Sequence, residues 1–197
     1  MSGKTHAVIG ATSALLILPT NHIGETILCA SFGALGGLLL DIDTKRSKGA
    51  VIFRKIRLAV LILLSCAAFV SIFGTYSGLI QMIGSWNLLD VICLLGLFFL
   101  YWYATTTPHR AFTHSIEFVC FNGILFYWLQ LPFYPAILIG EVAHILLDLL
   151  NKKDVTLSVL FQIKLSFNLA KADGMLDRIL SFLGTVSVVF LSLVHII

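Results

Sequence analysis

Long apolar stretches separated by short polar loops are the feature that most constrains the fold of this chain. A helix that crosses a bilayer takes about 20 apolar residues, with a range of about 17–25. Helices are required because no water in the bilayer core is available to bond a bare backbone. The sequence predicts about seven such helices, at residues 6–20, 23–40, 58–80, 88–104, 115–131, 135–150 and 179–197.

Composition supports the membrane class. Of the 197 residues, 58% are hydrophobic and 12% are charged, and a soluble domain this apolar could not cover its surface. We therefore expect an all-α, polytopic membrane helix bundle that forms a single domain over residues 1–197.

The net charge of +3 and the cysteines carry little functional information. The basic residues lie in loops between apolar segments, so we expect the lipid bilayer as a partner and no nucleic acid. The cysteines are scattered singly, which predicts small buried hydrophobic residues rather than disulfides or zinc ligands. They are Cys29, Cys66, Cys93 and Cys120.

The loops that carry Lys and Arg predict the orientation. Basic residues precede the first segment and lie between the second and third, the fourth and fifth, and the sixth and seventh. The other three loops, near residues 20–25, 81–87 and 132–135, contain neither Lys nor Arg. Cytoplasmic loops are enriched in these residues, so seven spans with a cytoplasmic N-terminus place every basic residue inside.

Imidazoles and carboxylates from four parts of the chain fall at the predicted cytoplasmic ends of the apolar segments. They are His6, Asp41, Asp43, His109, His114, His144 and Asp148. His144 and Asp148 are four residues apart, so they share one helix face. Ionisable groups in an apolar run need a partner, a water cavity or a metal. His22 and His195, by contrast, fall at the outer face.

Nitrogen and oxygen ligands of this kind suit zinc, and also manganese or iron. One catalytic zinc needs three protein ligands and an open position, and seven candidates are enough for two ions. Asp41 or Asp43 could bridge such a pair. A two-metal centre binds and ionises water and stabilises the oxyanion that forms. We therefore expect one or two divalent ions, with Zn²⁺ as the first candidate, at the cytoplasmic face.

Structural readings remain open for the separate clusters. Asp41 and Asp43 could end a helix and pair with Lys45 and Arg46. His109 and His114 could be interfacial side chains, and on a continuous helix they would point about 140° apart. The helix begins between them, or they serve different ions, or one of them is not a ligand.

Three further features carry weaker predictions. Glu141, one turn deeper than His144, would orient a ligand imidazole or be a buried neutral acid. Gly33 and Gly37 are four residues apart, which lets a neighbouring helix approach closely. Residues 152–177 alternate polar and apolar side chains and are expected to form an interfacial helix or loop.

Four motifs together resemble the YdjM family of bacterial inner-membrane proteins, which are described as membrane-bound metal-dependent hydrolases. They are Gly3-Lys4-Thr5-His6, Gly36-Gly37-Leu38-Leu39-Leu40-Asp41-Ile42-Asp43-Thr44, His109-Arg110-Ala111-Phe112-Thr113-His114-Ser115 and His144-Ile145-Leu146-Leu147-Asp148. The family usually has Pro at Leu40 and Gly at Ala111, positions that would not bind metal. The resemblance implies a multi-pass protein of the bacterial cytoplasmic membrane and a hydrolase.

The function expected is metal-assisted hydrolysis of a phosphoester or acyl bond, with Asp43, His114 and Arg110 in catalytic roles. Arg110 could clamp a phosphate, and Lys45 and Lys152 could steer anions. A site at headgroup depth suggests a phospholipid or lipid-linked substrate.

Two alternatives come from other classes of protein. An ion or small-solute transporter needs polar residues near the middle of the bilayer on several helices. A structural membrane protein could use the metal to join helices, and a closed coordination shell would favour that reading.

Overall fold

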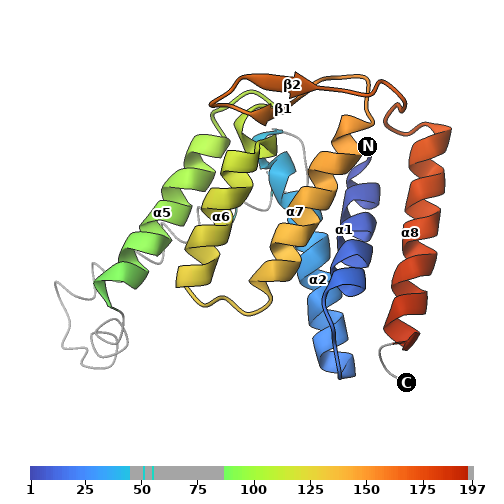
Figure 1. The fold of residues 1–197 in the computed structure, drawn as a ribbon, viewed down its shortest axis with the longest axis horizontal. Coiled ribbons are helices and arrows are strands. Elements are labelled where there is room, and N and C mark those ends of the chain that lie inside the picture. The colour runs from blue at the N-terminus through green and yellow to red at the C-terminus, as the bar shows by residue number, and fades with distance from the viewer. Residues whose placement is uncertain (45–50, 52–54, 56–86, 195–197) are drawn as a thin grey trace.

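The computed structural model describes residues 1–44, 51, 55 and 87–194. In this part of the chain six α-helices run side by side, and a small two-stranded sheet lies across one end of the bundle (Figure 1). The elements in chain order are α1 (Gly3–Ile17), α2 (Ile23–Leu39), the 3₁₀-helix η1 (Leu40–Asp43), α5 (Leu88–Ala104), the 3₁₀-helix η2 (Phe112–His114), α6 (Ile116–Trp128), α7 (Tyr134–Leu149), β1 (Val155–Ser158), β2 (Ile163–Leu165) and α8 (Met175–Val194).

Six of the seven predicted helices are confirmed. The remaining one, the third along the chain at residues 58–80, lies outside the described residues. The bounds of α5 are those predicted, whereas α6 ends at Trp128 and α8 begins four residues early at Met175. Among the described residues, Ile23–Asp43 and Met175–Val194 are long and apolar enough to cross a membrane. The count of seven spans therefore stays a prediction.

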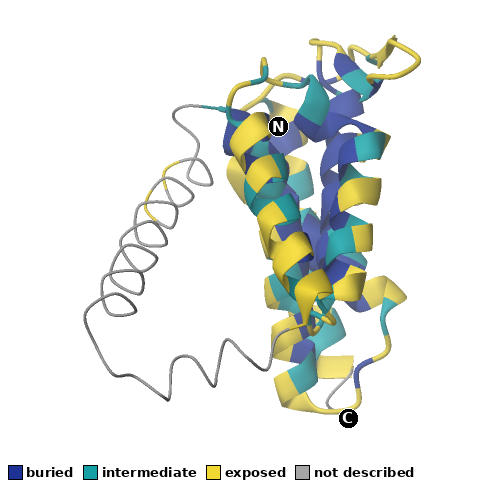
Figure 2. Cartoon of the chain, turned by 90° about the vertical axis from the view of Figure 1, so that its left-hand side faces the viewer, coloured by how far each residue is buried: buried dark blue, intermediate teal, exposed yellow. Residues whose placement is uncertain are grey.

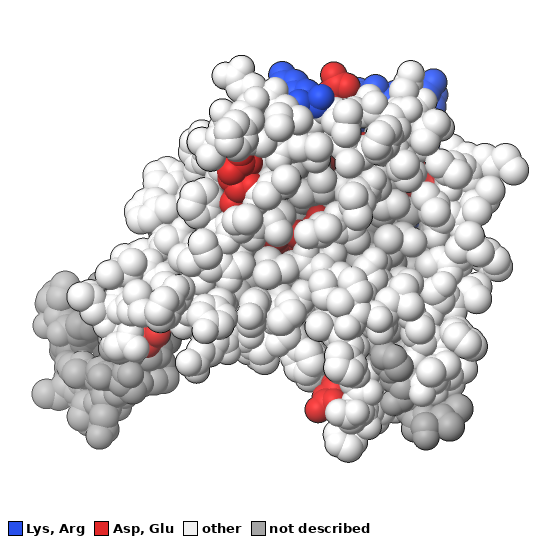
Figure 3. Space-filling model, in the orientation of Figure 1, with Lys and Arg blue, Asp and Glu red and all other residues white. Residues whose placement is uncertain are grey.

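The all-α class needs a correction in the stretch expected to be an interfacial helix or loop. There β1 pairs with β2 as an antiparallel hairpin, with Val155 opposite Leu165 and Thr156 opposite Lys164. Alternation of polar and apolar residues with period two is the pattern of a half-buried strand, and β-branched residues favour it. The fold is mostly helical, with a hairpin (residues 155–165) over the end where Lys and Arg gather (Figures 1 and 3).

Glycines bring α1, α2 and α7 into close contact. A Cβ added to Gly37 would collide with the carbonyl oxygen of His6 in α1, and one added to Gly36 would collide with that of Ile137 in α7. A Cβ added to Gly33 would also collide with the carbonyl oxygen of Gly10 in α1. The predicted packing role of the Gly33-x-x-x-Gly37 stretch is confirmed, and His6 lies directly against α2 as a result.

Apolar side chains form both the core and the outer surface. One core cluster joins Leu40, Tyr101, Phe118 and Ile145 to Val155 of the hairpin. Large apolar side chains are also exposed on the helices, as expected for a surface that contacts lipid. Figure 2 shows exposed residues along the helices.

The cysteines are free among the described residues, as predicted. Cys29 and Cys93 are buried, and Cys66 lies outside the described residues. The prediction of burial is wrong for Cys120 on α6, which is exposed because it faces away from the bundle.

Candidate metal centre

Four segments carry the histidines and aspartates to the basic end of the bundle. His6 lies in the second turn of α1, His144 and Asp148 lie in the last turns of α7, and α2 continues into η1 with Asp41 and Asp43. The fourth segment is the loop of residues 105–115. Helix α5 ends where this loop begins, because the hydroxyls of Thr105, Thr106 and Thr107 bond to the last carbonyl groups of the helix. A proline, which has no amide hydrogen to continue the helix, follows them.

All seven predicted ligands lie together at this end. They form three overlapping groups, and within each group the candidate ligand atoms lie within 4.8 Å of one another. The groups are His6, His144 and Asp148; Asp41, His114 and His144; and Asp43, His109 and His114. These groups could hold a metal ion. Ligation by each residue stays a prediction.

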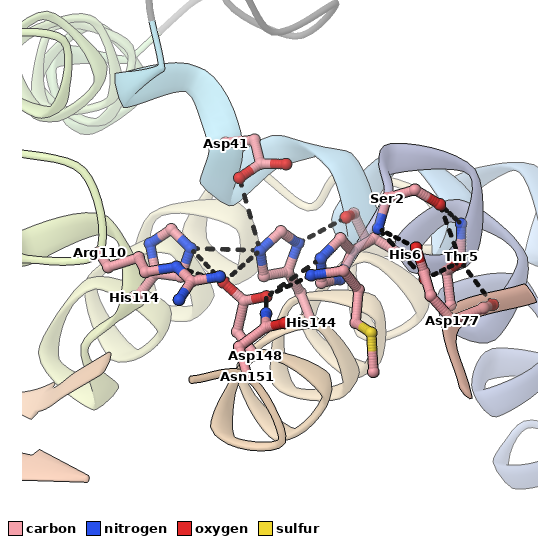
Figure 4. Close-up of polar contacts among 12 residues, drawn as sticks. Ser2, Thr5, His6, Asp41, Arg110, His114, His144, Asp148, Asn151 and Asp177 are labelled. Atoms are coloured by element: carbon pink, nitrogen blue, oxygen red, sulfur yellow. Dashed lines mark hydrogen bonds and ion pairs between the residues drawn. The ribbon is translucent and has the colours of Figure 1, made fainter. Parts of the chain in front are cut away.

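His114 and His144 face each other at the centre of the cluster (Figure 4). Their Nε2 atoms are 3.2 Å apart. Nδ1 of His144 lies 2.7 Å from the carbonyl oxygen of Gly37, which can only accept, so Nδ1 carries the hydrogen. In the neutral imidazole the Nε2 atom then presents a lone pair to the centre of the cluster.

A hydrogen-bond relay fixes the same tautomer of His114. The hydroxyl of Thr113 donates to Oδ2 of Asp43 over 2.6 Å, so its oxygen is left to accept from Nδ1 of His114, 2.8 Å away. The Nε2 lone pair of His114 therefore also points inward. Thr113 lies outside the predicted set, and the sequence signal for it was its position in the His109–Ser115 motif, next to His114.

Asp148 is the most heavily contacted carboxylate of the cluster (Figure 4). Its Oδ2 atom lies 3.5 Å from Nε2 of His114 and 3.9 Å from Nε2 of His144. Its Oδ1 atom lies 3.2 Å from Nε2 of His6 and accepts a hydrogen bond of 2.7 Å from Asn151. Asp148 therefore joins the histidines of α1, α7 and the loop.

His6 stacks on His144. The ring centroids are 3.7 Å apart and the planes are inclined by 12°. Its Nδ1 atom is buried and has no hydrogen-bond partner among the described residues. A buried nitrogen without a partner is rare in folded proteins and is available to a ligand.

His109 and His114 both lie in the loop between α5 and α6 and not on one continuous helix. Because α6 begins at Ile116, after both histidines, the helical separation of about 140° does not apply. Nδ1 of His109 lies 2.8 Å from Oδ1 of Asp43. Burial lowers the pKa of His109, but the hydrogen bond to Asp43 and the charges of Asp43 and Asp41 outweigh it, so the pKa is raised.

Arg110 has a left-handed backbone conformation with φ of 65°, uncommon for a residue with a side chain. Its amide donates to Oδ2 of Asp43 and its carbonyl accepts from Thr156 of β1. Its Nε atom lies 3.0 Å from Oδ2 of Asp148, an ion pair without hydrogen-bond alignment. Such strained residues concentrate at functional sites.

Glu141 is not part of this cluster. It is fully buried, and its Oε1 atom accepts a hydrogen bond of 2.8 Å from Asn122 of α6. None of its hydrogen bonds among the described residues reaches an imidazole. No contact therefore supports the expected role of Glu141 in orienting a ligand histidine. Asn122 also lies outside the predicted set, although a polar side chain within an apolar segment was a signal for it.

The cluster opens to its surroundings on one side. Side chains of His6, His114, His144 and Asp148 are at most 2% exposed, whereas those of Asp41 and His109 are 21% and 40% exposed. The open side is that of η1 and the loop. His22 lies at the other end of α2, as expected, and His195 is outside the described residues.

Comparison with known proteins adds a family and nothing more specific. No curated protein and no solved structure matches this chain. The model of the family described as YdjM inner membrane protein matches residues 1–196. The buried His and Asp groups, the apolar helices and this match lead to one assignment: the chain belongs to the YdjM inner membrane protein family.

Proposed function

We propose that this protein is a membrane-bound, metal-dependent hydrolase whose site is the cluster at the basic end of the bundle. The observation that carries the proposal is the pair of inward-facing Nε2 atoms of His114 and His144, 3.2 Å apart. Two neutral imidazoles in these tautomers repel each other at that distance unless a proton or a metal ion lies between them, and the carboxylates of Asp148 and Asp41 beside the pair offer a metal ion further ligands. Family membership supports the same class of function.

The donor set fits a divalent ion. Tetrahedral zinc with Zn–N bonds of about 2.0–2.1 Å places neighbouring ligand nitrogens about 3.3 Å apart. The two Nε2 atoms lie at that separation, and Oδ2 of Asp148 and Oδ1 of Asp41 are 3.9 Å and 3.7 Å from His144 Nε2. His114, His144 and Asp148, with Asp41 at the open side, would hold the first ion, and His6 or His109 would contribute to a second.

A bound divalent ion supplies Lewis acidity toward water and toward the bond to be cleaved. The protein side chains supply position. Thr113 and Gly37 hold the two imidazoles in the ligating tautomer, and the buried walls exclude bulk water.

We assign Asp43 a positioning role in place of the expected catalytic one. Its two oxygens already accept from the side chains of His109, Thr44 and Thr113 and from the amide of Arg110. Asp43 thereby fastens the loop to the end of α2. Arg110 stays the candidate phosphate clamp, because its guanidinium adjoins Asp148 on the open side of the site.

The substrate class follows from position. Lys and Arg gather at the end of the bundle that carries the site (Figure 3), and basic residues at the end of a membrane bundle lie at the level of the lipid headgroups. A phospholipid or lipid-linked phosphoester is the substrate that reaches this level most readily.

Transport is the second candidate, and one observation favours it. Glu141 and Asn122 form a buried polar pair between α7 and α6, away from the cluster. Polar pairs inside a membrane bundle can mark an ion pathway.

The test compares two histidine variants. Zinc, manganese and iron would be measured in purified wild-type protein, His144→Ala and His22→Ala, followed by hydrolysis assays on a phospholipid panel. His22 is the matched control because it lies at the other end of α2 and its side chain makes no capping bond. We expect wild type and His22→Ala to bind metal and cleave lipid, and His144→Ala to do neither.

Two results would count against the proposal. Equal metal in His144→Ala would refute the ligand assignment. Metal binding without cleavage of any phospholipid would favour the structural or transport alternative.

A further inference from the structure

The turn of the hairpin exposes apolar side chains in a place where polar ones are usual. Leu160 and Phe161 are each 78% exposed, and Val159 beside them is also exposed. Turns that face water are normally polar. The tip of the hairpin (residues 159–161) therefore presents an apolar surface that the rest of the described chain leaves uncovered.

The tip is held firmly at the start of α6. The carboxylate of Glu117, in the first turn of that helix, accepts hydrogen bonds from the hydroxyl of Ser158 and from the amides of Val159 and Leu160. The hydroxyl of Ser158 in turn accepts from the amide of Phe161. The apolar residues are therefore fixed in an exposed position by bonds to the bundle.

The start of α6 marks the edge of the lipid-facing wall. The outer side of α6 exposes Ile116, Phe121 and Ile124, a surface suited to acyl chains. Because Glu117 follows Ile116 directly, the tip lies at the end of this apolar wall. Figure 1 shows the hairpin lying across this end of α5, α6 and α7.

The charges beside the hairpin fit an anionic lipid surface. Lys152 and Lys153 precede β1 and Lys164 lies on β2, and all three are exposed. Apolar side chains that enter the headgroup region, flanked by lysines, are the pattern of interfacial membrane contacts.

We propose that the tip of the hairpin inserts into the headgroup region of the adjacent leaflet and anchors the hairpin to anionic phospholipid. The hairpin then forms a lipid-bound roof beside the candidate metal centre.

The same hairpin is bonded to Arg110. The amide of Thr156 donates to the carbonyl oxygen of Arg110, and Nη1 of Arg110 donates to the carbonyl oxygen of Lys153, each over 3.0 Å. Movement of the hairpin at the membrane surface therefore moves the guanidinium that contacts Asp148. This link to the site rests on the proposed function, whereas the anchoring does not.

The test places a spin label at Phe161→Cys in a variant whose native cysteines are replaced by serine. Asp154→Cys, exposed and charged just before β1, is the matched control. The protein would be reconstituted in vesicles of phosphatidylcholine and phosphatidylglycerol, and collisions with oxygen and with a water-soluble nickel chelate would be measured. We expect a severalfold higher ratio of oxygen to nickel collisions at position 161 than at position 154.

Equal ratios at the two positions would overturn the proposal. Dipolar broadening at position 161 that disappears on dilution with unlabelled protein would also overturn it, because a second copy of the chain would then cover the tip. These readouts require neither metal nor hydrolysis, so they fail or succeed independently of the proposed activity.

Discussion

Thr113 binds no metal in this proposal, yet it determines which nitrogen of His114 is available. Valine has nearly the same shape but lacks the hydroxyl that bonds to Asp43 and His114. We expect Thr113→Val to weaken zinc binding about 10–100-fold, as loss of an orienting partner typically does. Competition with a chromophoric chelator would measure the affinity.

Thr113→Ser is the matched control because it keeps the hydroxyl, and we expect it to bind zinc as the wild type does. Unchanged affinity in Thr113→Val would mean that the relay from Asp43 does not orient His114.

The buried pair of Glu141 and Asn122 carries a second prediction, because two of its side-chain oxygens have no hydrogen-bond partner among the residues that the structure describes. They are Oε2 of Glu141 and Oδ1 of Asn122. A protonated Glu141 would donate from Oε2, and the amide group of a glutamine at position 141 would donate in its place. We expect Glu141→Gln to retain the wild-type Tm and Glu141→Leu to lose about 1–3 kcal/mol of stability.

Both variants remove the carboxylate, so thermal unfolding in detergent separates the hydrogen bond from the charge. Equal destabilisation of the two variants would show that Glu141 is needed as an anion.

The sequence predicted the site residues that have an ionisable side chain near the end of an apolar segment. Helical spacing placed His144 with Asp148, and the loop charges placed the other clusters at the same end. The roles of Thr113 and Asp43 could not be predicted, because they depend on which hydrogen bonds form once distant segments meet.

At the scale of the elements, the separation of α1 from α2 decides whether His6 reaches the cluster. Gly37→Ala would drive a Cβ into the carbonyl oxygen of His6. Overpacking of this kind costs about 1–3 kcal/mol, and the helices would move apart. We expect a lower Tm and reduced metal content, measured on the purified protein.

Gly24→Ala is the matched control, since it lies on the same helix and an added Cβ there meets no atom within 4 Å. Equal loss of metal in both variants would show that the close approach of α1 at Gly37 is not what sets the metal content.

The elements differ in how far the sequence could predict them. Long apolar runs predicted α5 to the residue, because helix length and hydrophobicity are local properties. The hairpin was missed because its strands have four and three residues, too few for a period of two to stand out from an interfacial helix.

For the whole molecule, the distribution of charge predicts how the bundle lies in the membrane. Lys and Arg gather at the hairpin end (Figure 3), and cytoplasmic loops are enriched in these residues. We expect a cysteine at Gln130, in the turn between α6 and α7, to react with a membrane-impermeant maleimide added to spheroplasts. A cysteine at Asp154 should react only after permeabilisation, and the reverse pattern would invert the predicted orientation.

The candidate metal centre joins α1, η1, the loop and α7 at one end of the bundle, so a bound ion would stabilise the whole fold. A ligand that binds only the folded state adds about 2.7 kcal/mol at a free concentration of 100 times its Kd. We therefore expect chelation to lower the Tm of the wild type and of His22→Ala, and added zinc to restore it. His144→Ala should unfold at one temperature with or without zinc, because the ion has lost its central ligand. A zinc-dependent Tm in His144→Ala would place the stabilising ion elsewhere in the molecule.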